Sequence, residues 1–323
     1  MAYRAARRRR VVTRVLVIVN PAAGRGRVER LWPRAEAALR AAGVAFETAK
    51  TRAAGEATAL AERAARDYPV VIAAGGDGTV HEVVNGLLRT SAGAATVALG
   101  VLPLGSGDDF AKMIPPEPPV GGRPHDWIAA VAKIARGETR RFDAGRLESD
   151  TLEGGRVHYF ANGMDVGFGA QGAANAAALP KFVKGRAAYF AALAQTLVDY
   201  PQLRLRLSVD DAPTEEIETT MTAVMNGRCF GSSFWVCPEA RADDGLFDVM
   251  CADTLGRIAI LGLVPRIMRG THATHPHVRM LRARRVVFES DVPMAVEADG
   301  ELPFPAARRV AVNVLPGVLN VIV

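Results

Sequence analysis

The chain has 323 residues, of which 49% are hydrophobic and 23% charged, and its formal net charge at pH 7 is +6. This is the composition of a globular protein with a sizeable core, and the length is sufficient for two domains. The apolar runs are only strand-length, which excludes a bilayer-spanning helix. The three cysteines, at positions 229, 237 and 251, lack metal-ligand spacing, so neither a disulfide framework nor a zinc site is indicated.

Arginines crowd the N-terminus at positions 4, 7 to 10 and 14. Residues 1–10 are expected to form a disordered basic tail that is simply solvated. The functional alternative is attraction to anionic lipid headgroups, to which each basic residue contributes on the order of 1 kcal/mol. Nucleic acid is not an expected partner, because no aromatic residue beyond Tyr3 lies among the arginines.

Residues 11–138 alternate strand and helix patterns. Strands are expected at 11–19, 44–49, 70–74 and 97–102, and helices at 28–42, 56–66, 79–89 and 126–136. This alternation predicts an α/β domain with a parallel sheet covered on both faces. Ligands of such sheets bind at the carboxyl ends of the strands.

The third strand runs directly into a glycine-rich turn, in the sequence VVIAAGGDGTVH from Val70 to His81. A buried strand followed by such a turn and a helix presents bare backbone N–H groups at a helix N-terminus, where the helix dipole favours an anion. The pattern predicts a phosphate cradle. The alternative is a strand-to-helix turn whose glycines only satisfy backbone geometry.

A second glycine-bearing turn, PLGSGDDFA at 103–111, follows the next strand. It could close the same nucleotide site, or it could be an Asp N-cap on a short helix with ordinary turn chemistry. The proline-rich segment IPPEPPVGGRP at 114–124 is expected to be a surface loop or a hinge, because proline fixes φ and removes a donor.

From residue 139 onward the sequence pattern changes and predicts short strands with one helix at 185–199. Strands are expected at 139–148, 157–162, 203–209, 216–225, 246–251, 284–288 and 294–297. Residues 139–323 are therefore expected to form a mostly antiparallel domain, with the last strand returning to the first domain. His272, His275 and His277 are expected in a solvated loop, and a metal site is the less favoured alternative because no carboxylate lies in the run.

Several motifs in order identify a family. They are VNPAAGRG, GGDGTVHEVVNGL, PLGSGDDFA, ANGMDVGF, the KGRAAY helix, CPEARADDGLFDV and EADGE. This ordered set resembles the diacylglycerol kinase catalytic-domain family, particularly the bacterial lipid kinases of the YegS type, which are similar to sphingosine and ceramide kinases. The resemblance implies an α/β nucleotide-binding domain, of the kind found in NAD kinases, followed by a β-sandwich-like domain for the lipid substrate.

The resemblance also implies roles for individual residues. Those expected to bind ATP are Asn20, Thr51, Gly75, Gly76, Asp77, Gly78, Thr79, Val80, His81 and Ser106. Glu301 is the expected proton acceptor from the lipid hydroxyl, with Asp299 beside it as partner or rival. A Mg²⁺ site is expected at Asp244 with the backbone carbonyls of Arg241 and Leu246, although DDG is also a common tight turn.

The third motif departs from the family pattern, which has threonine and asparagine where this chain has Ser106 and Asp108. Serine keeps the hydroxyl that ATP would contact. Asp108 adds negative charge near the expected phosphates, and it could serve an extra Mg²⁺ or cap the following helix.

The leading functional hypothesis is an ATP-dependent lipid kinase that transfers the γ-phosphoryl group to a hydroxyl of diacylglycerol or a sphingoid lipid. An NAD kinase-like enzyme and a catalytically silent nucleotide-binding regulator are the alternatives. The protein is expected in the cytoplasm, with peripheral contact at the inner membrane surface, and a homodimer is left open. Phe230, Phe234 and Trp235 fit either an acyl-chain cleft or an ordinary core.

Overall fold

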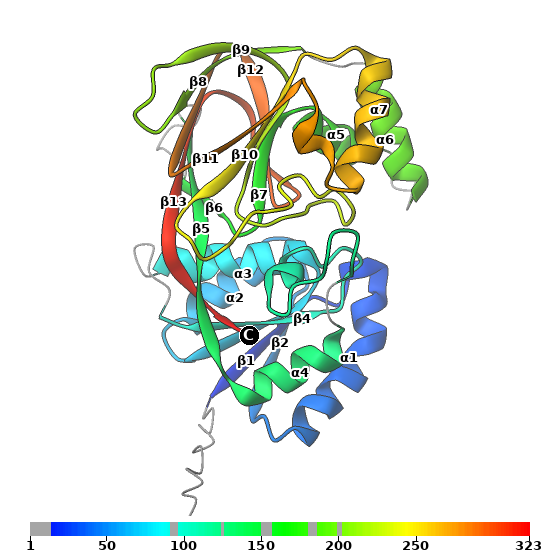
Figure 1. Cartoon of the computed structure of the whole chain (residues 1–323). Helices are drawn as coiled ribbons and strands as arrows, with labels where there is room; N and C mark the ends of the chain where they lie inside the picture. The colour runs from blue at the N-terminus through cyan, green and yellow to red at the C-terminus, as the bar shows by residue number, and fades with distance from the viewer. Residues whose placement is uncertain (1–13, 91–95, 124–125, 150–156, 180–185, 199–201) are drawn as a thin grey trace, which may run out of the picture. The chain divides into compact units, whose positions relative to one another are not determined.

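The computed structural model of the chain describes residues 14–90, 96–123, 126–149, 157–179, 186–198 and 202–323. The basic tail expected at residues 1–10 lies outside the described residues. The chain forms two compact units (Figure 1). The first contains the described residues up to Gly105, those between 125 and 141, and Leu319–Val323, and the second contains the remainder.

The first unit is built on a parallel sheet whose strands run in the order β2-β1-β3-β4-β13. The strands are β1 Val15–Val19, β2 Phe46–Lys50, β3 Val70–Gly75, β4 Ala98–Pro103 and the last residues of β13 Glu301–Ile322. The helices are α1 Ala23–Ala41, α2 Glu56–Ala64, α3 Asp77–Thr90 and α4 Trp127–Arg136. Figure 1 shows α2 and α3 on one face of the sheet and α1 and α4 on the other.

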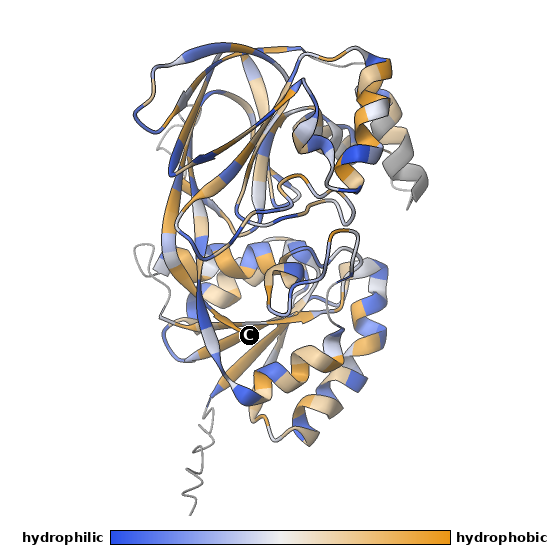
Figure 2. Cartoon of the chain, viewed as in Figure 1, coloured by the Kyte–Doolittle hydropathy of each residue, from blue (hydrophilic) through white to orange (hydrophobic). Residues whose placement is uncertain are grey.

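Hydrophobic strands explain why this sheet is central to its unit. Every residue of β1, β3 and β4 is buried, which requires a helical layer on each face. Figure 2 shows the hydrophobic character of these strands. The predicted parallel α/β arrangement is confirmed, and α4 is capped by Asp126 and ends at Gly137 with φ 66°.

The second unit is mostly antiparallel, with the strand order β11-β10-β9-β7-β12-β13, while β8 pairs with β9 and β12, and β5 with β6. Its strands are β5 Thr139–Ser149, β6 Val157–Phe160, β7 Gly163–Gly167, β8 Leu203–Val209, β9 Glu215–Met225, β10 Phe247–Asp253, β11 Val278–Ala283 and β12 Arg285–Ala298. Its helical elements are η1 Phe110–Met113, α5 Phe168–Ala178, α6 Arg186–Val198, α7 Arg257–Met268 and η2 His272–Thr274. The antiparallel prediction is confirmed.

Several elements of this unit differ from the sequence-based expectation. Helices α5 and α7 were not expected, because one is rich in small residues and the other is apolar on both sides and contains Pro265. The two strands expected at 284–288 and 294–297 are one strand, β12, whose register with β13 shifts between them. Strand β13 was not expected over its 22 residues, since four internal prolines and glycines read as breaks.

The solvated-loop prediction is wrong for His272, whose side chain is 0% exposed. Its Nε2 lies 2.8 Å from the carbonyl oxygen of Val236, whereas His275 and His277 are exposed or half-buried. Within the described residues, no three histidine, cysteine or acidic side chains gather in a way that would hold a metal ion. The described helices are also too short or too polar to cross a membrane.

Candidate functional site

Two predicted site residues, Asn20 and Thr51, lie at the carboxyl edge of the first unit's sheet. The N–H of Asn20 donates to the carbonyl of Ala74 at 3.1 Å, and the N–H of Thr51 donates to that of Val19 at 2.9 Å. Strands β1 and β3 are neighbours, although β2 lies between them in the sequence. Their helices leave toward opposite faces, so this is the switch point at which doubly wound sheets bind ligands.

The glycine turn after β3 begins helix α3. The N–H groups of Thr79 and Val80 both donate to the carbonyl of Gly76, at 2.9 and 3.1 Å, which starts the helix. Gly76 and Asp77 are half-buried and Gly78 is exposed, so the outer side of the turn is accessible. This accessible N-terminus of α3, with the positive end of its helix dipole, is the candidate anion site of the unit.

Not every residue of the predicted ATP run presents its side chain at this turn. Val80 and His81 are 3% and 4% exposed, and the side-chain amide of Asn85 donates to the carbonyl of His81 at 3.0 Å. Their side chains belong to the core, so these two residues could contribute to nucleotide binding only by holding the backbone of the turn in place. Thr79 Oγ1 is buried and has no hydrogen-bond partner among the described residues, which leaves a hydroxyl for a phosphate oxygen.

The loop after β1 supplies a second positive element at the same edge. Gly24, Arg25 and Gly26 all have left-handed backbone conformations, with φ of 57°, 60° and 77°, so the regular helix begins only after them. The guanidinium of Arg27 donates to the carbonyl of Gly105 at 2.5 Å, which ties this loop to the end of the segment after β4. Two arginines beside a helix N-terminus suit an anionic ligand.

Replacing Gly75 by alanine is expected to weaken nucleotide binding at this turn. A Cβ at Gly75 would overlap Thr79 Oγ1 and lie 2.6 Å from Thr79 Cβ, so the start of α3 would have to move. The loss should be at least about tenfold in nucleotide affinity, because the backbone donors would no longer converge. Isothermal titration of ATP measures it. Gly262→Ala, where a Cβ meets nothing within 4 Å, is the control and should bind normally.

In the second unit, Asp299 anchors the EADGE turn to the adjacent chain. Its carboxylate accepts hydrogen bonds from the N–H groups of Ala161, Asn162 and Gly163, at 2.8, 2.9 and 3.0 Å. The backbone at Asp299 is left-handed, with φ 51°, and its own N–H donates to the carbonyl of Gly163. A carboxylate that accepts three backbone donors holds the turn in place and is a positioning group rather than a free base.

Glu301 is the other acid of this turn and stands first in β13. Its side chain is exposed, and within the described part of the chain it has no hydrogen-bond or ion-pair partner. The turn below it is rigid, because Gly300 N–H donates to the Glu297 carboxylate and Asp299 is held by three donors. Glu301 is thus an unencumbered carboxylate on a fixed support, the condition for a general base.

Beneath the turn lies a buried pair of acids that the sequence did not single out. Asp165 on β7 and Glu297 on β12 stand opposite each other in register and are 0% and 7% exposed. Burial raises the pKa of Asp165 to about 6, despite the hydrogen bond that its carboxylate accepts from the Ala170 N–H at 2.7 Å. Burial and then the charge of Asp165 raise the pKa of Glu297 well above its usual value. One shared proton relieves the repulsion.

This pair predicts a pH-dependent stability. Because the folded state keeps its protons to a higher pH than the unfolded state does, stability is lost as the pH rises from near 4 through about 6. Asp165→Asn is therefore expected to increase the free energy of unfolding at pH 8 by on the order of 2 kcal/mol, with the gain vanishing near pH 4. Denaturant unfolding at several pH values measures it.

The control for that experiment is Asp211→Asn, which changes an exposed carboxylate of the same unit. The free energy of unfolding of Asp211→Asn should be close to that of wild type at each pH. A stabilisation by Asp165→Asn that is equal at pH 4 and pH 8 would show that the pair does not share a proton in the way described.

The predicted metal turn holds its aspartate in other contacts. Asp244 forms an ion pair with the guanidinium of Arg282, and its Oδ1 accepts from the Leu246 N–H at 3.1 Å. The buried Asp143 carboxylate accepts from the Gly245 N–H at 2.7 Å and so fixes the same turn. In this structure Asp244 is neutralised by an arginine, and the Mg²⁺ site expected at Asp244 with the backbone carbonyls of Arg241 and Leu246 stays a prediction.

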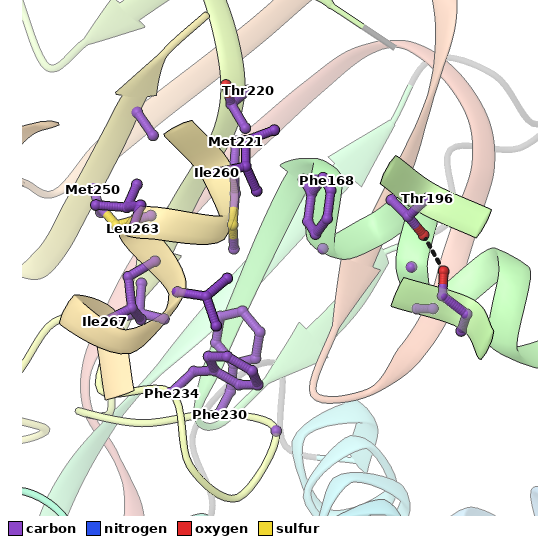
Figure 3. Close-up of a pocket in the computed structure, with 18 residues that line it drawn as sticks. Phe168, Thr196, Thr220, Met221, Phe230, Phe234, Met250, Ile260, Leu263 and Ile267 are labelled. Carbon is purple, nitrogen blue, oxygen red and sulfur yellow. Dashed lines mark hydrogen bonds between the residues drawn. The ribbon is translucent and has the colours of Figure 1, made fainter. Parts of the chain in front are cut away.

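An apolar pocket of about 260 Å³ lies within the second unit (Figure 3). It opens among α5, α6 and α7, strands β9 and β10, and the loop that carries Phe230 and Phe234. Among the described residues that line it, only Thr196 and Thr220 carry a side-chain polar group. The hydroxyl of Thr196 donates to the Ala192 carbonyl at 2.7 Å and that of Thr220 to the Asp253 carbonyl at 2.6 Å. The pocket therefore suits a hydrocarbon ligand.

Phe230 and Phe234 line the pocket, whereas Trp235 is 1% exposed and lies in the core. The core alternative is confirmed for Trp235, whereas an acyl-chain cleft at Phe230 and Phe234 stays a prediction that the apolar pocket allows. The side chains of residues 181–190, which include the start of the helix expected at 185–199, lie outside the described set.

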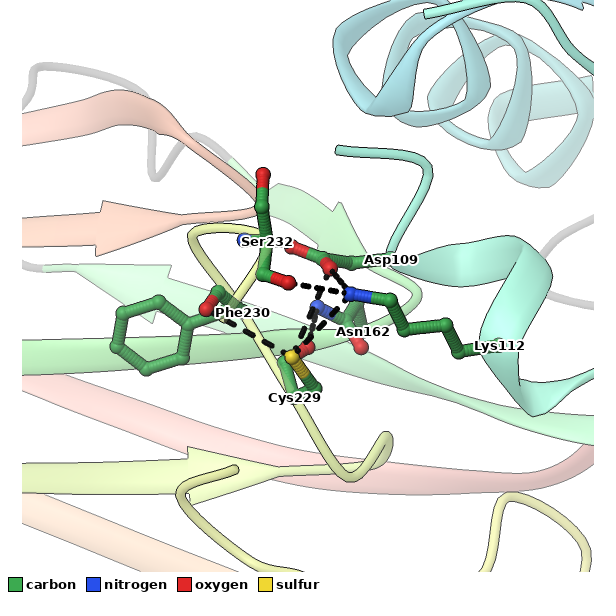
Figure 4. A network of polar contacts seen from close by, with 6 residues as sticks. All are labelled: Asp109, Lys112, Asn162, Cys229, Phe230 and Ser232. Atoms are coloured by element: carbon green, nitrogen blue, oxygen red, sulfur yellow. Dashed lines mark hydrogen bonds and ion pairs between the residues drawn. The ribbon is translucent and has the colours of Figure 1, made fainter. Parts of the chain in front are cut away.

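A buried polar network fastens that loop to the PLGSGDDFA segment (Figure 4). Lys112 Nζ lies 2.5 Å from Asp109 Oδ1 and donates to the Ser232 carbonyl at 2.8 Å, while the Ser232 N–H donates to Asp109 Oδ2 at 2.9 Å. Burial lowers the pKa of Lys112, but the adjacent Asp109 outweighs burial and the net direction is upward. The ion pair thus positions the loop that carries Phe230 and Phe234.

The same network changes the interpretation of the segment. Asp109 precedes η1 without capping it through its side chain, so the N-cap alternative is not realised there. Cys229 Sγ lies 3.4 Å from Lys112 Nζ, and burial and then Asp109 raise the pKa of the thiol to about 12, which leaves it unreactive. Ser106 is exposed, and Asp108 has a left-handed backbone with φ 52°.

The fold and these sites define a class, in which one unit is α/β with a glycine turn at a helix N-terminus and the other is antiparallel with an apolar pocket. The model of the diacylglycerol kinase catalytic domain matches residues 14–147. The model of the YegS C-terminal NAD kinase beta sandwich-like domain matches residues 163–323. Together the two family models cover most of both units of this chain.

Relatives extend over nearly the whole chain. A diacylglycerol kinase of Mycobacterium tuberculosis (strain H37Rv) is 30% identical over 326 residues, covering 98% of this chain and 96% of the relative. A diacylglycerol kinase of Staphylococcus epidermidis is 28% identical over 289 residues, covering 89% of this chain and 85% of the relative. The chain therefore belongs to the diacylglycerol kinase family.

Solved structures show the same fold. A crystal structure of a diacylglycerol kinase from Bacillus anthracis (strain Sterne) superimposes with a TM-score of 0.70 at 21% identity, covering 96% of both chains. Another diacylglycerol kinase structure from that strain gives 0.72 at 22% identity over 96% of both chains. The resemblance first seen in the ordered motifs is confirmed.

Proposed function

We propose that this chain, a lipid kinase of the diacylglycerol kinase family, transfers the γ-phosphoryl group of ATP to a hydroxyl of diacylglycerol or a sphingoid lipid. The observation that carries the proposal is the apolar pocket of the second unit, because a phosphotransferase of this fold needs such a cavity only if its acceptor carries hydrocarbon chains. Membership of the family supports the phosphotransferase chemistry.

The glycine turn of the first unit supports ATP as the donor. The N-terminus of α3, the accessible turn at Gly76 to Gly78 and the unpaired Thr79 hydroxyl are suited to phosphate oxygens. Asn20 and Thr51 belong to the same edge of the sheet. Bound Mg²⁺ would neutralise charge on the transferred phosphoryl group, and the half-buried Asp77 at this turn is the residue suited to orient it.

Glu301 is suited to accept the proton of the attacking hydroxyl, because its carboxylate is exposed and its backbone is fixed by the turn. Asp299 would keep that carboxylate at a constant position, since its own oxygens are engaged by three N–H donors. Ser106, also exposed, offers a hydroxyl for the nucleotide, as the family pattern leads us to expect. Phosphoryl transfer depends chiefly on such positioning.

Purified protein incubated with γ-labelled ATP and a lipid panel tests the proposal. The panel should contain diacylglycerol, a sphingoid base and ceramide, with NAD as a separate acceptor. Label in a lipid product that disappears with excess unlabelled ATP supports a lipid kinase. Label in NADP instead favours the NAD kinase-like alternative, and ATP binding without transfer to any acceptor favours the silent regulator.

A lipid acceptor would require this enzyme, which we propose to be cytoplasmic, to work at a membrane surface.

 The acceptor is embedded in a bilayer, so the reaction takes place where the protein meets that surface. We therefore keep peripheral contact with the inner membrane surface as part of the proposal. The homodimer left open by the sequence stays a prediction.

A further inference from the structure

We propose that helix α7 is the element that docks this protein on an anionic membrane, with its outer face inserted among the lipid headgroups. The inference rests on the proposed function, because it names the surface through which the same acceptor pocket would receive lipid. It assigns membrane contact to a folded element of the second unit rather than to the arginine tail.

Helix α7, Arg257–Met268, is apolar on two opposite faces. Its inner face, at spacings of three and four residues, lines the pocket with Ile260, Leu263, Val264 and Ile267. The outer face repeats the same spacing with exposed residues, Ile258, Leu261, Gly262 and Pro265. A helix that is hydrophobic all round is stable in a core or in a membrane, and the outer face of α7 is in neither within this unit.

The exposure of this face is large for apolar side chains. Ile258 is 87% exposed and Leu261 is 53% exposed. The patch continues onto the end of α6, where Val198 is 69% exposed. Arg257 joins the two helices, because its guanidinium donates to the carbonyls of Leu197 and Val198 at 2.7 and 2.9 Å. Clustered apolar exposure of this kind marks an interaction surface, and much of α7 is coloured hydrophobic in Figure 2.

Charge identifies the partner as an anionic lipid surface. Helix α7 contains no acidic residue, and its exposed arginines, Arg257 and Arg266, are followed directly by Arg269. From position 254 to position 288 the sequence contains seven arginines and no aspartate or glutamate, and two of the seven, Arg279 and Arg282 on β11, are paired with Glu215 and Asp244. Apolar side chains flanked by arginines are the pattern of a helix that lies in the headgroup layer of an anionic membrane.

Vesicle binding tests the inference without relying on catalysis. Full-length protein is sedimented with phosphatidylcholine vesicles that contain or lack phosphatidylglycerol. The Ile258→Asp/Leu261→Asp double variant is expected to bind the anionic vesicles at least about 30-fold more weakly than wild type, because two inserted side chains become charged. Arg266→Gln/Arg269→Gln should lose about tenfold, and only on anionic vesicles.

Val292→Asp is the matched control, since Val292 is 56% exposed on β12 of the same unit and lies outside α7. It should bind vesicles like wild type. Ile258→Ser/Leu261→Ser is a second variant that removes the apolar groups without adding charge, and circular dichroism verifies that each variant is folded. Undiminished vesicle binding by the Ile258→Asp/Leu261→Asp and Ile258→Ser/Leu261→Ser variants would overturn the inference. So would loss of a wild-type dimer in the variants with vesicle binding unchanged, because a second copy would then be the partner.

The two proposals can fail separately. With a short-chain, water-soluble diacylglycerol as acceptor, the α7 variants should retain wild-type turnover, whereas their turnover on diacylglycerol in anionic vesicles should fall by at least about tenfold. Wild type that phosphorylates the soluble acceptor without binding vesicles would refute the α7 inference alone. Wild type that binds vesicles through α7 but phosphorylates no acceptor would refute the proposed function alone.

Discussion

Glu301→Gln is expected to reduce kcat for phosphoryl transfer by about 1000-fold while leaving the free energy of unfolding unchanged. The carboxylate of Glu301 is exposed and has no partner in the described part of the chain, so its replacement removes no interaction that stabilises the fold. Glutamine keeps the size of the side chain but cannot accept the proton of the acceptor hydroxyl. Initial-rate kinetics with ATP and a short-chain diacylglycerol measure the effect.

Glu216→Gln is the control for this substitution. Glu216 is an exposed glutamate on β9 of the same unit, far in sequence from the EADGE turn. It should leave kcat within about twofold of wild type, because surface substitutions of this kind have small effects. A Glu301→Gln enzyme with wild-type kcat would remove Glu301 from the chemistry and leave the positioned nucleotide as the main source of catalysis.

Asp299→Ala is expected to lower both stability and activity. The substitution leaves the N–H groups of Ala161, Asn162 and Gly163 without their acceptor. Because the turn is partly exposed and water can reach some of these groups, the expected loss is about 2 to 4 kcal/mol in the free energy of unfolding. The released turn would no longer fix Glu301, so kcat should fall by at least about 100-fold. Denaturant unfolding and initial rates measure the two effects.

The chain provides a matched control for the structural part of that loss. Asp210 also has a left-handed backbone, with φ 49°, and its Oδ1 accepts from the N–H groups of Arg284 and Arg285 at 2.8 Å each. Asp210→Ala should therefore reduce stability by about 1 to 3 kcal/mol but leave kcat unchanged, because no site residue depends on that turn. Equal kcat losses in the two variants would mean that Asp299 acts only through overall stability.

The sequence predicted the first unit well because its signals are local. Buried strands that end in glycine turns, and helices with one apolar face, are visible within ten to fifteen residues. The VVIAAGGDGT segment therefore placed the β3 turn and α3 within two residues of their observed positions. The ordered motifs identified the family for the same reason, since each motif is a short segment with its own geometry.

The second unit was harder to predict because its interactions are distant in the sequence. Asp165 and Glu297 form a pair across two strands, and Lys112 reaches the Ser232 carbonyl across 120 positions. No periodicity reveals such partners. Helix α7 was missed because it contains a proline and is apolar on both faces, so that it lacks the single apolar face of a typical surface helix. In the structure one of these apolar faces lines the pocket and the other is exposed.

Mass spectrometry of lipids from cells that express wild type or Glu301→Ala tests the central claim most directly. We predict a phosphorylated lipid that accumulates with wild type and is absent with the variant, at equal levels of the two proteins. Identical lipid profiles in the two cultures would contradict the claim that this protein is a lipid kinase whose chemistry depends on the acid of the EADGE turn.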